Sequence, residues 1–309
     1  MVTHRAIPAR PNLEQYRKQA KDLLDGISRN LPDALSRVGQ FHPRLQGQAV
    51  DPGATRLKLA DAQLVIAREH GFESWPKFSA HLLTLQAGPP DAFEERIRAG
   101  EVELPIEVGG RRNARALVLF ALAGTASRHD AGIREIAAAF HRASFCTVLA
   151  DLLTGQEAAT DAVEETLRYD IPLLASRMTA IVDRFAGDAA FQSLRMGLFG
   201  SGSGAAAAAS VARQRATAIH AFVSSAGRPD LSGSSLAWIG APCLFIFGGD
   251  DAVGYGFMRT LMTVLQRTVP KRIEVIDGAA GRFEAATHVA RAAELATQWF
   301  DQYLVGEPS

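Results

Sequence analysis

The chain has 309 residues, of which 47% are hydrophobic and 21% are charged, as is usual for a folded globular protein. Its 33 basic and 33 acidic side chains give no net charge at neutral pH, so neither nucleic acid nor an anionic membrane is expected as a partner. Every apolar run is shorter than the roughly 18 residues of a membrane span, and the first residues lack an apolar signal core. These features predict a cytoplasmic protein.

The two cysteines, Cys146 and Cys243, lie in apolar, strand-like runs. This setting favours buried free thiols over a disulfide. No group of cysteines and histidines has the spacing of a zinc site. We therefore expect neither a metal nor a cofactor.

Residues 12–86 have the pattern of four short helices. The first carries one apolar stripe, formed by Leu13, Tyr16, Ala20, Leu23, Leu24 and Ile27. A second helix is predicted over 31–38 and a third within 56–72, where Gly71 ends it. A fourth follows within 73–85, with Ser74 as N-cap and Pro76 in its first turn. We assign residues 1–88 to a small all-α module, followed by the linker "QAGPPDAF".

From about residue 95 to residue 309, short apolar runs alternate with longer helical stretches. Continuously apolar runs such as "ALVLFAL" are typical of parallel strands buried on both faces. The pattern predicts an α/β domain with a mostly parallel sheet and helices on both faces. Strands are predicted at 102–108, 116–122, 145–150, 196–200, 219–223, 243–248 and 272–276, and helices at 131–143, 169–186, 204–215, 254–267 and 288–304.

The glycine-rich stretch "FGSGSGAAAAA", residues 199–209, joins a predicted strand to a predicted helix. Such a turn can cradle a phosphate at the helix N-terminus, but no Gly-Lys-Ser follows here. It can also be a nucleophile elbow, the strained turn that presents a catalytic side chain. The elbow interpretation gains from an acidic pair, Asp250 and Asp251, at the end of a later strand, because hydrolases order nucleophile, acid and histidine in that way.

Residues 102–304 resemble the dienelactone-hydrolase-like branch of the α/β-hydrolase superfamily. The stretches that carry the resemblance include "ALVLFALAGTASRHD", "MGLFGSGSGAAAAA", "APCLFIFGGDDAVG" and "VIDGAAGRFE". The N-terminal stretch "LADAQLVIAREHGFESWPKF" resembles a helical module that bacterial proteins carry ahead of other domains, often ankyrin repeats. The resemblance implies an α/β-hydrolase fold for about two thirds of the chain.

The resemblance also implies where a catalytic triad would lie, and two of its three members are glycines. The serine position of the family falls on Gly202 and the histidine position on Gly281, whereas the acid position is matched by Asp251. In the loop after the first long strand, Leu122 replaces a family histidine that helps to form the oxyanion hole. Glycine supplies neither a nucleophile nor a base, so the triad is degenerate.

Two serines beside the empty position could rescue catalysis. Ser203 or Ser201 would be the nucleophile if the register shifted, with His288, or else His129, as the base. The alternative is that the two serines form the turn and cap the following helix. Candidate ligand-binding residues lie on predicted loops that follow strand ends. They are Leu122, Ala123, Arg128 and Arg228, and Arg128 is the candidate contact for a carboxylate.

Three functional hypotheses follow. The first is a degenerate, pseudoenzyme-like hydrolase homologue that binds a small ligand or a protein partner of unknown identity. The second is an active esterase or lactonase that uses Ser203 or Ser201. The third is an interaction protein that acts through the helical module, and a homo-oligomer is compatible with all three.

Overall fold

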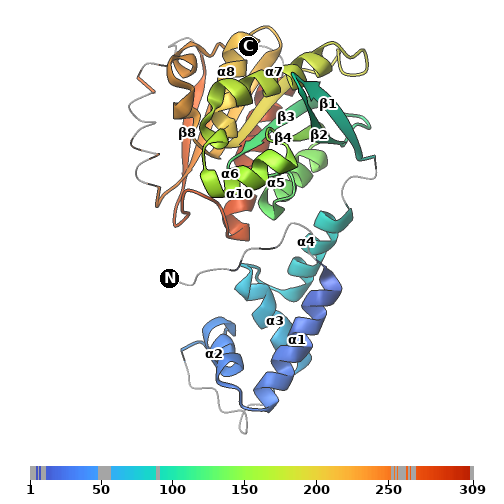
Figure 1. Cartoon of the computed structure of the whole chain (residues 1–309). Coiled ribbons are helices and arrows are strands. Elements are labelled where there is room, and N and C mark those ends of the chain that lie inside the picture. Colours follow the sequence, from blue (N-terminus) through green and yellow to red (C-terminus); the bar gives the residue numbers. More distant parts are fainter. Residues whose placement is uncertain are drawn as a thin grey trace. The chain divides into compact units, whose positions relative to one another are not determined.

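A computed structural model describes residues 12–47, 57–87, 91–251 and 269–306, together with the single residues 5, 7, 254, 256, 262, 263 and 265. The chain divides into two compact units, the first comprising residues 1–87 and 284–287 and the second comprising residues 88–283 and 288–309. Among the described residues, the first unit contains the four N-terminal helices, and the second contains all the strands (Figure 1).

The helical unit consists of α1 (Leu13–Ser28), α2 (Pro32–Phe41), α3 (Leu59–Glu69) and α4 (Trp75–Ala87). Its core forms around Phe78, which is fully buried and lies 5.0 Å from the ring of Tyr16 and 5.2 Å from that of His70. The predicted N-cap Ser74 accepts a hydrogen bond from the Lys77 amide, and the Asn12 side chain caps α1 by accepting one from the Glu14 amide. The four helices predicted from the apolar stripes are therefore confirmed.

The second unit is built on one eight-stranded sheet in the order β1-β2-β4-β3-β5-β6-β7-β8. The pairings of β2 with β1 and with β4 are antiparallel, and all the others are parallel. The strands are β1 (Phe93–Ala99), β2 (Val102–Gly109), β3 (Ala116–Ala123), β4 (Phe145–Asp151), β5 (Met196–Gly202), β6 (Ile219–Gly227), β7 (Cys243–Gly248) and β8 (Lys271–Ile276).

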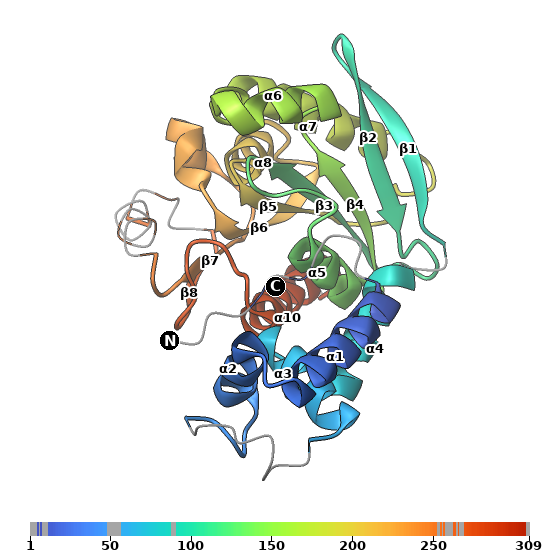
Figure 2. The ribbon, with the colours of Figure 1, turned by 60° about the horizontal axis from the view of Figure 1, so that its bottom comes forward.

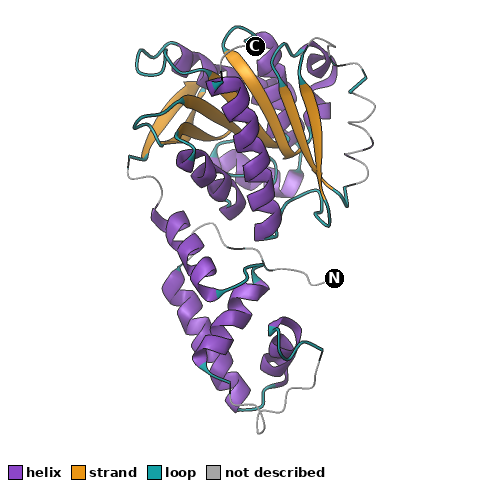
Figure 3. Ribbon diagram, turned by 180° about the vertical axis from the view of Figure 1, so that it is seen from behind, coloured by secondary structure: helices purple, strands orange, loops and turns teal. Residues whose placement is uncertain are grey.

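Helices cover both faces of this sheet (Figures 2 and 3). On one face, α5 (Ala131–Arg142) and α10 (Ala286–Phe300) pack against β3 through residues such as Phe120, Phe140 and Phe300. The other face is covered by α7 (Ile171–Ala186) and α8 (Gly204–Gln214). Among the described residues, the remaining helical segments are α6 (Gly155–Glu164), the 3₁₀ segments η1 (Leu167–Tyr169) and η2 (Pro229–Trp238), and the π-helical segment η3 (Asp301–Val305).

The fold class expected from the sequence is confirmed, with two additions and one untested element. Strand β1 is not predicted, because "FEERIRA" buries only Ile97 and Ala99 and reads as a polar segment. Helix α6 is also not predicted, because it is mostly exposed and buries only Asp161, so it carries no apolar stripe. The helix predicted over 254–267 falls largely outside the described residues.

Two further expectations concern the cysteines and the membrane. Cys146 and Cys243 are buried and free, as predicted, and burial raises the pKa of the Cys146 thiol to about 12. In the part of the chain that the structure describes, no helix is both long and apolar enough to cross a bilayer.

Candidate active site at the carboxyl end of the sheet

The strand-turn-helix formed by β5 and α8 has the geometry of a nucleophile elbow with its apex at Gly202. Gly202 has φ +58°, a left-handed conformation that favours glycine. A Cβ on Gly200 would lie 2.5 Å from Cα of Ala205, and one on Gly204 would lie 2.2 Å from the Ala121 carbonyl oxygen. Glycine is therefore required two residues before and two residues after Gly202, which is the spacing of the G-x-S-x-G elbow centred on this position.

The serines beside Gly202 do not occupy the apex. Ser203 has φ −71° and ψ −17°, so its backbone already belongs to the helix that follows. Its side chain is buried, and its Oγ has no hydrogen-bond partner in the described part of the chain. The expectation that Ser203 caps α8 through its hydroxyl is wrong, because no side-chain cap bond forms. Ser201 lies inside β5 and is also buried.

The end of β3 lies directly against the apex, since Ala123, the last residue of β3, is the register partner of Gly202 in β5. A Cβ built on Gly202 would lie 2.4 Å from the carbonyl oxygen of Ala123, well inside van der Waals contact. The chain continues through Gly124, whose φ is +73° and whose added Cβ would lie 3.3 Å from Ser203 Oγ. Space that a nucleophilic side chain would need is thus taken by the main chain. Leu122, the candidate ligand contact beside it, is a core residue that is 1% exposed.

Asp251 and Gly281, which are thirty positions apart in the sequence, lie side by side. A Cβ on Gly281 would be 3.4 Å from Asp251 Oδ2, so a side chain at this position would begin next to the carboxylate. Backbone hydrogen bonds hold the two loops together, from Asp250 N to Ala279 O at 2.9 Å and from Gly249 N to Ile276 O at 2.8 Å. The two residues to which the resemblance assigns the acid and histidine positions are therefore neighbours in the structure.

Arg128, the candidate carboxylate-binding residue, is buried against acidic side chains of the protein itself. Its Nη1 donates to Glu94 at 3.1 Å, its backbone N–H donates to Asp151 at 2.8 Å, and its Nε lies 3.3 Å from the same Asp151 carboxylate. Burial nevertheless raises the pKa of Asp151 above its ordinary value, against the opposing effect of these contacts. Two internal carboxylates thus occupy the guanidinium, and its role as a ligand contact stays a prediction.

Arg228 extends from the end of β6 beside the elbow. Its backbone N–H donates to the Gly202 carbonyl at 2.9 Å, and its guanidinium pairs with Asp230 at 2.6 Å while its side chain remains half exposed. The hydrogen bond to Asp230 raises the pKa of Arg228, with smaller contributions from Tyr169 and Asp251. Tyr169, which is 55% exposed, was not singled out in the sequence because its neighbourhood depends on how η1 folds back.

Neither candidate base forms a hydrogen bond with the hydroxyl of Ser203, which has no partner in the described part of the chain. His288 lies in the first turn of α10, beside Val289, which packs toward α5 at Gly132. The backbone N–H of His129 donates to Ser127 Oγ at 3.3 Å, and His129 contributes to the electrostatic environment of Asp151. The structure therefore brings together Gly202, Ala123 and Arg228 at the elbow, and Asp251 with Gly281.

Comparison with known proteins gives relatives of two kinds. A solved dienelactone hydrolase from Anabaena variabilis is 35% identical, with a TM-score of 0.66, over 70% of this chain and 99% of that protein. A dienelactone-hydrolase-like promiscuous phosphotriesterase from metagenomic libraries is 18% identical with a TM-score of 0.56, over 69% of this chain and 98% of its own, which is a likeness of fold. No protein-family model matches the chain.

Two Mycobacterium tuberculosis proteins named "Putative phosphoribosyl transferase" are each 35% identical over 237 residues. The match covers 74% of this chain but 52% of theirs, so the chain spans about half the length of these relatives. Their name describes the longer proteins and is not transferred to this chain.

Proposed function

Because this chain belongs to the dienelactone hydrolase family of α/β-hydrolases, we propose that its second unit is a degenerate member of that family, one that binds a small ligand or a protein partner without hydrolysing it. The chemistry of the family needs a nucleophile at the elbow and a histidine beside the acid. Here both positions are glycine, and only the acid, Asp251, remains.

The observation that carries this proposal is the close approach of the Ala123 carbonyl to Gly202. A substitution of the nucleophile alone would leave a cavity with an unused oxyanion site. A carbonyl oxygen 2.4 Å from the Cβ position instead leaves too little room for a side chain at this place unless the main chain shifts. In a triad protease, loss of the serine or the histidine alone lowers turnover by a factor of about 10⁶. An additional steric block at the apex would lower turnover further.

The alternative is an active serine hydrolase that uses Ser203. One observation favours it, since Ser203 Oγ is buried without a hydrogen-bond partner in the described part of the chain. Against it stand the helical backbone of Ser203 and the lack of a described imidazole in contact with its hydroxyl. A nucleophilic serine needs such a base within hydrogen-bonding distance, or one water away.

A fluorophosphonate probe with intact-mass detection tests the proposal on the full chain. We expect no added mass and no hydrolysis of aryl esters or lactones above buffer. Ser203→Ala and Ser201→Ala are the matched controls. A covalent adduct on the parent chain that disappears in Ser203→Ala would overturn the proposal in favour of the active hydrolase.

A thermal-shift screen of esters, lactones and small carboxylates tests the binding half of the proposal. A ligand that binds the folded state stabilises it by RT ln(1 + [L]/Kd), about 2.7 kcal/mol at a hundredfold excess over Kd. A shift reduced by Arg228→Gln, with no product formed, supports ligand binding near the elbow. If no compound shifts the unfolding transition, and any bound protein partner is retained by the helical unit alone, the hypothesis of an interaction protein that acts through the helical module replaces this one.

A further inference from the structure

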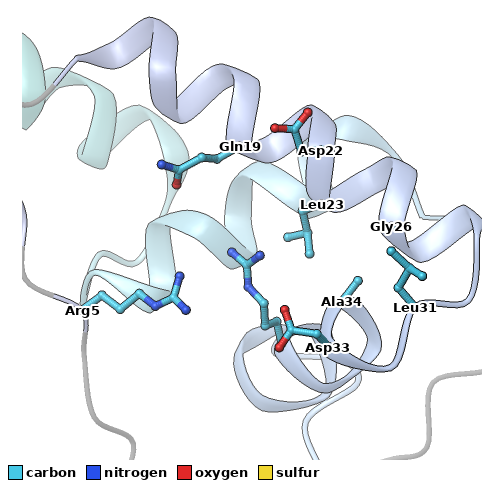
Figure 4. Close-up of a pocket in the computed structure, with 9 residues that line it drawn as sticks. Arg5, Gln19, Asp22, Leu23, Gly26, Leu31, Asp33 and Ala34 are labelled. Atoms are coloured by element: carbon cyan, nitrogen blue, oxygen red, sulfur yellow. The ribbon is translucent and has the colours of Figure 1, made fainter.

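The helical unit contains a pocket between α1 and α2 that no part of the hydrolase proposal uses (Figure 4). Its volume is about 340 Å³, within the range of pockets that hold small molecules. Residues from three places in the sequence line it, since Arg5 precedes α1, Gln19 and Leu23 lie on α1, and Asp33 lies on α2.

The basic side of the pocket is held in place by a buried ion pair. Arg37 donates to both oxygens of Glu69, at 2.6 and 2.8 Å, and Glu69 is only 2% exposed. Arg5 lies on the other side of that carboxylate at 3.8 Å, beyond hydrogen-bonding distance, with its side chain 64% exposed. The backbone of Arg5 is fixed by hydrogen bonds to Glu69 at 2.7 Å and to the His70 ring at 2.8 Å. Arg5 therefore retains donors for an incoming carboxylate.

The pocket also carries negative charge and an apolar surface. Asp22 and Asp33 line it, and Asp33 interacts electrostatically with Arg37, one turn further along α2. Leu23 and Leu31 supply the apolar part, and Leu31 is 44% exposed although it is large and hydrophobic. The lining thus contains two cationic and two anionic groups around an aliphatic surface.

We propose that this pocket binds the zwitterion of an α-amino acid with an apolar side chain. The carboxylate would pair with Arg5 at the edge of the Arg37–Glu69 ion pair, and the ammonium group would pair with Asp33. The side chain would lie on Leu23 and Leu31. A ligand with only one charge would face a like charge across the pocket, whereas a zwitterion offers an opposite charge to both sides at once.

Titration calorimetry of the full chain with leucine tests this proposal, with leucinamide and N-acetyl-leucine as the probes that each lack one charge. Leucine should bind, and each analogue should bind at least tenfold more weakly because one charged side of the pocket remains unpaired. A leucyl-leucine arm distinguishes a free amino acid from the end of a peptide, since the dipeptide separates its two charges. Equal affinity of leucine and both analogues would overturn the proposal.

Variants of the pocket give a second measurement. Arg5→Gln and Asp33→Asn should each weaken leucine binding at least tenfold. Arg29→Gln is the matched control. Arg29 is the C-cap residue of α1 and pairs with Asp25 at 3.4 Å on the exposed surface, outside the pocket. Arg37 is left intact because its loss would leave Glu69 buried with a distant partner. If leucine gives no heat at about 10 mM, roughly tenfold above a Kd of 1 mM, the pocket is not an amino-acid site.

Discussion

Gly202→Ala is the substitution that most directly examines the closed elbow. The change adds one methyl group to a residue with φ +58°, where that methyl group would lie 2.4 Å from the Ala123 carbonyl oxygen. The unfavourable backbone conformation costs about 1–3 kcal/mol for a residue with a Cβ. Displacement of the well-packed Ala123 peptide adds about 1–3 kcal/mol more. We expect the variant to lose about 2–6 kcal/mol of unfolding free energy, a large part of the stability of an ordinary domain.

Gly233→Ala is the matched control for this prediction. Gly233 has the same φ, +58°, but no described atom lies within 4 Å of its Cβ position. It should therefore lose only the backbone contribution of about 1–3 kcal/mol, and the difference between the two variants measures the contact with Ala123. Urea unfolding followed by far-ultraviolet circular dichroism supplies both free energies. Equal losses of unfolding free energy in the two variants would refute the reasoning, because displacement of Ala123 at the end of β3 would then require no free energy.

Three further predictions concern other parts of the second unit. Gly281→His should lower the unfolding free energy by no more than about 1 kcal/mol, because the Cβ at this position only approaches the Asp251 carboxylate at 3.4 Å. The double variant Gly202→Ser with Gly281→His should nevertheless remain inactive in an ester assay. Restored turnover would mean that Ala123, at the end of β3, moves away from position 202. Burial lowers the pKa of His141 to about 4 in the folded protein, below the value of about 6.5 in the unfolded chain. Between these two pH values only the unfolded chain binds a proton at His141, so the unfolding free energy should fall by about 2 kcal/mol as the pH drops from 7 to 4.5. His141→Gln should flatten that dependence in urea titrations, and an unchanged slope would contradict it. Cys146, with its pKa raised to about 12, should not react with a thiol reagent at pH 8 until the protein is unfolded, and rapid native labelling would contradict its burial.

The sequence alone was sufficient to predict the fold class. Continuous apolar runs such as "ALVLFAL" predict buried parallel strands because both faces of those strands contact helices. The glycines of "GSGSG" predict the elbow because positions 200 and 204 leave no room for a Cβ. Strand β1 could not be predicted from an apolar run, because this edge strand buries only alternate residues and carries charged side chains at the other positions.

What surrounds the elbow was decided only by the tertiary structure. No sequence pattern predicts that the Ala123 carbonyl lies against Gly202, because that contact depends on β3 pairing with β5 in the register that makes these two residues partners. The same holds for Arg128, whose pairing with Glu94 requires β1 to join the sheet. Periodicity and glycine spacing reflect restrictions on each residue's own backbone and faces, whereas contacts between distant loops arise only when the strands that carry them are assembled.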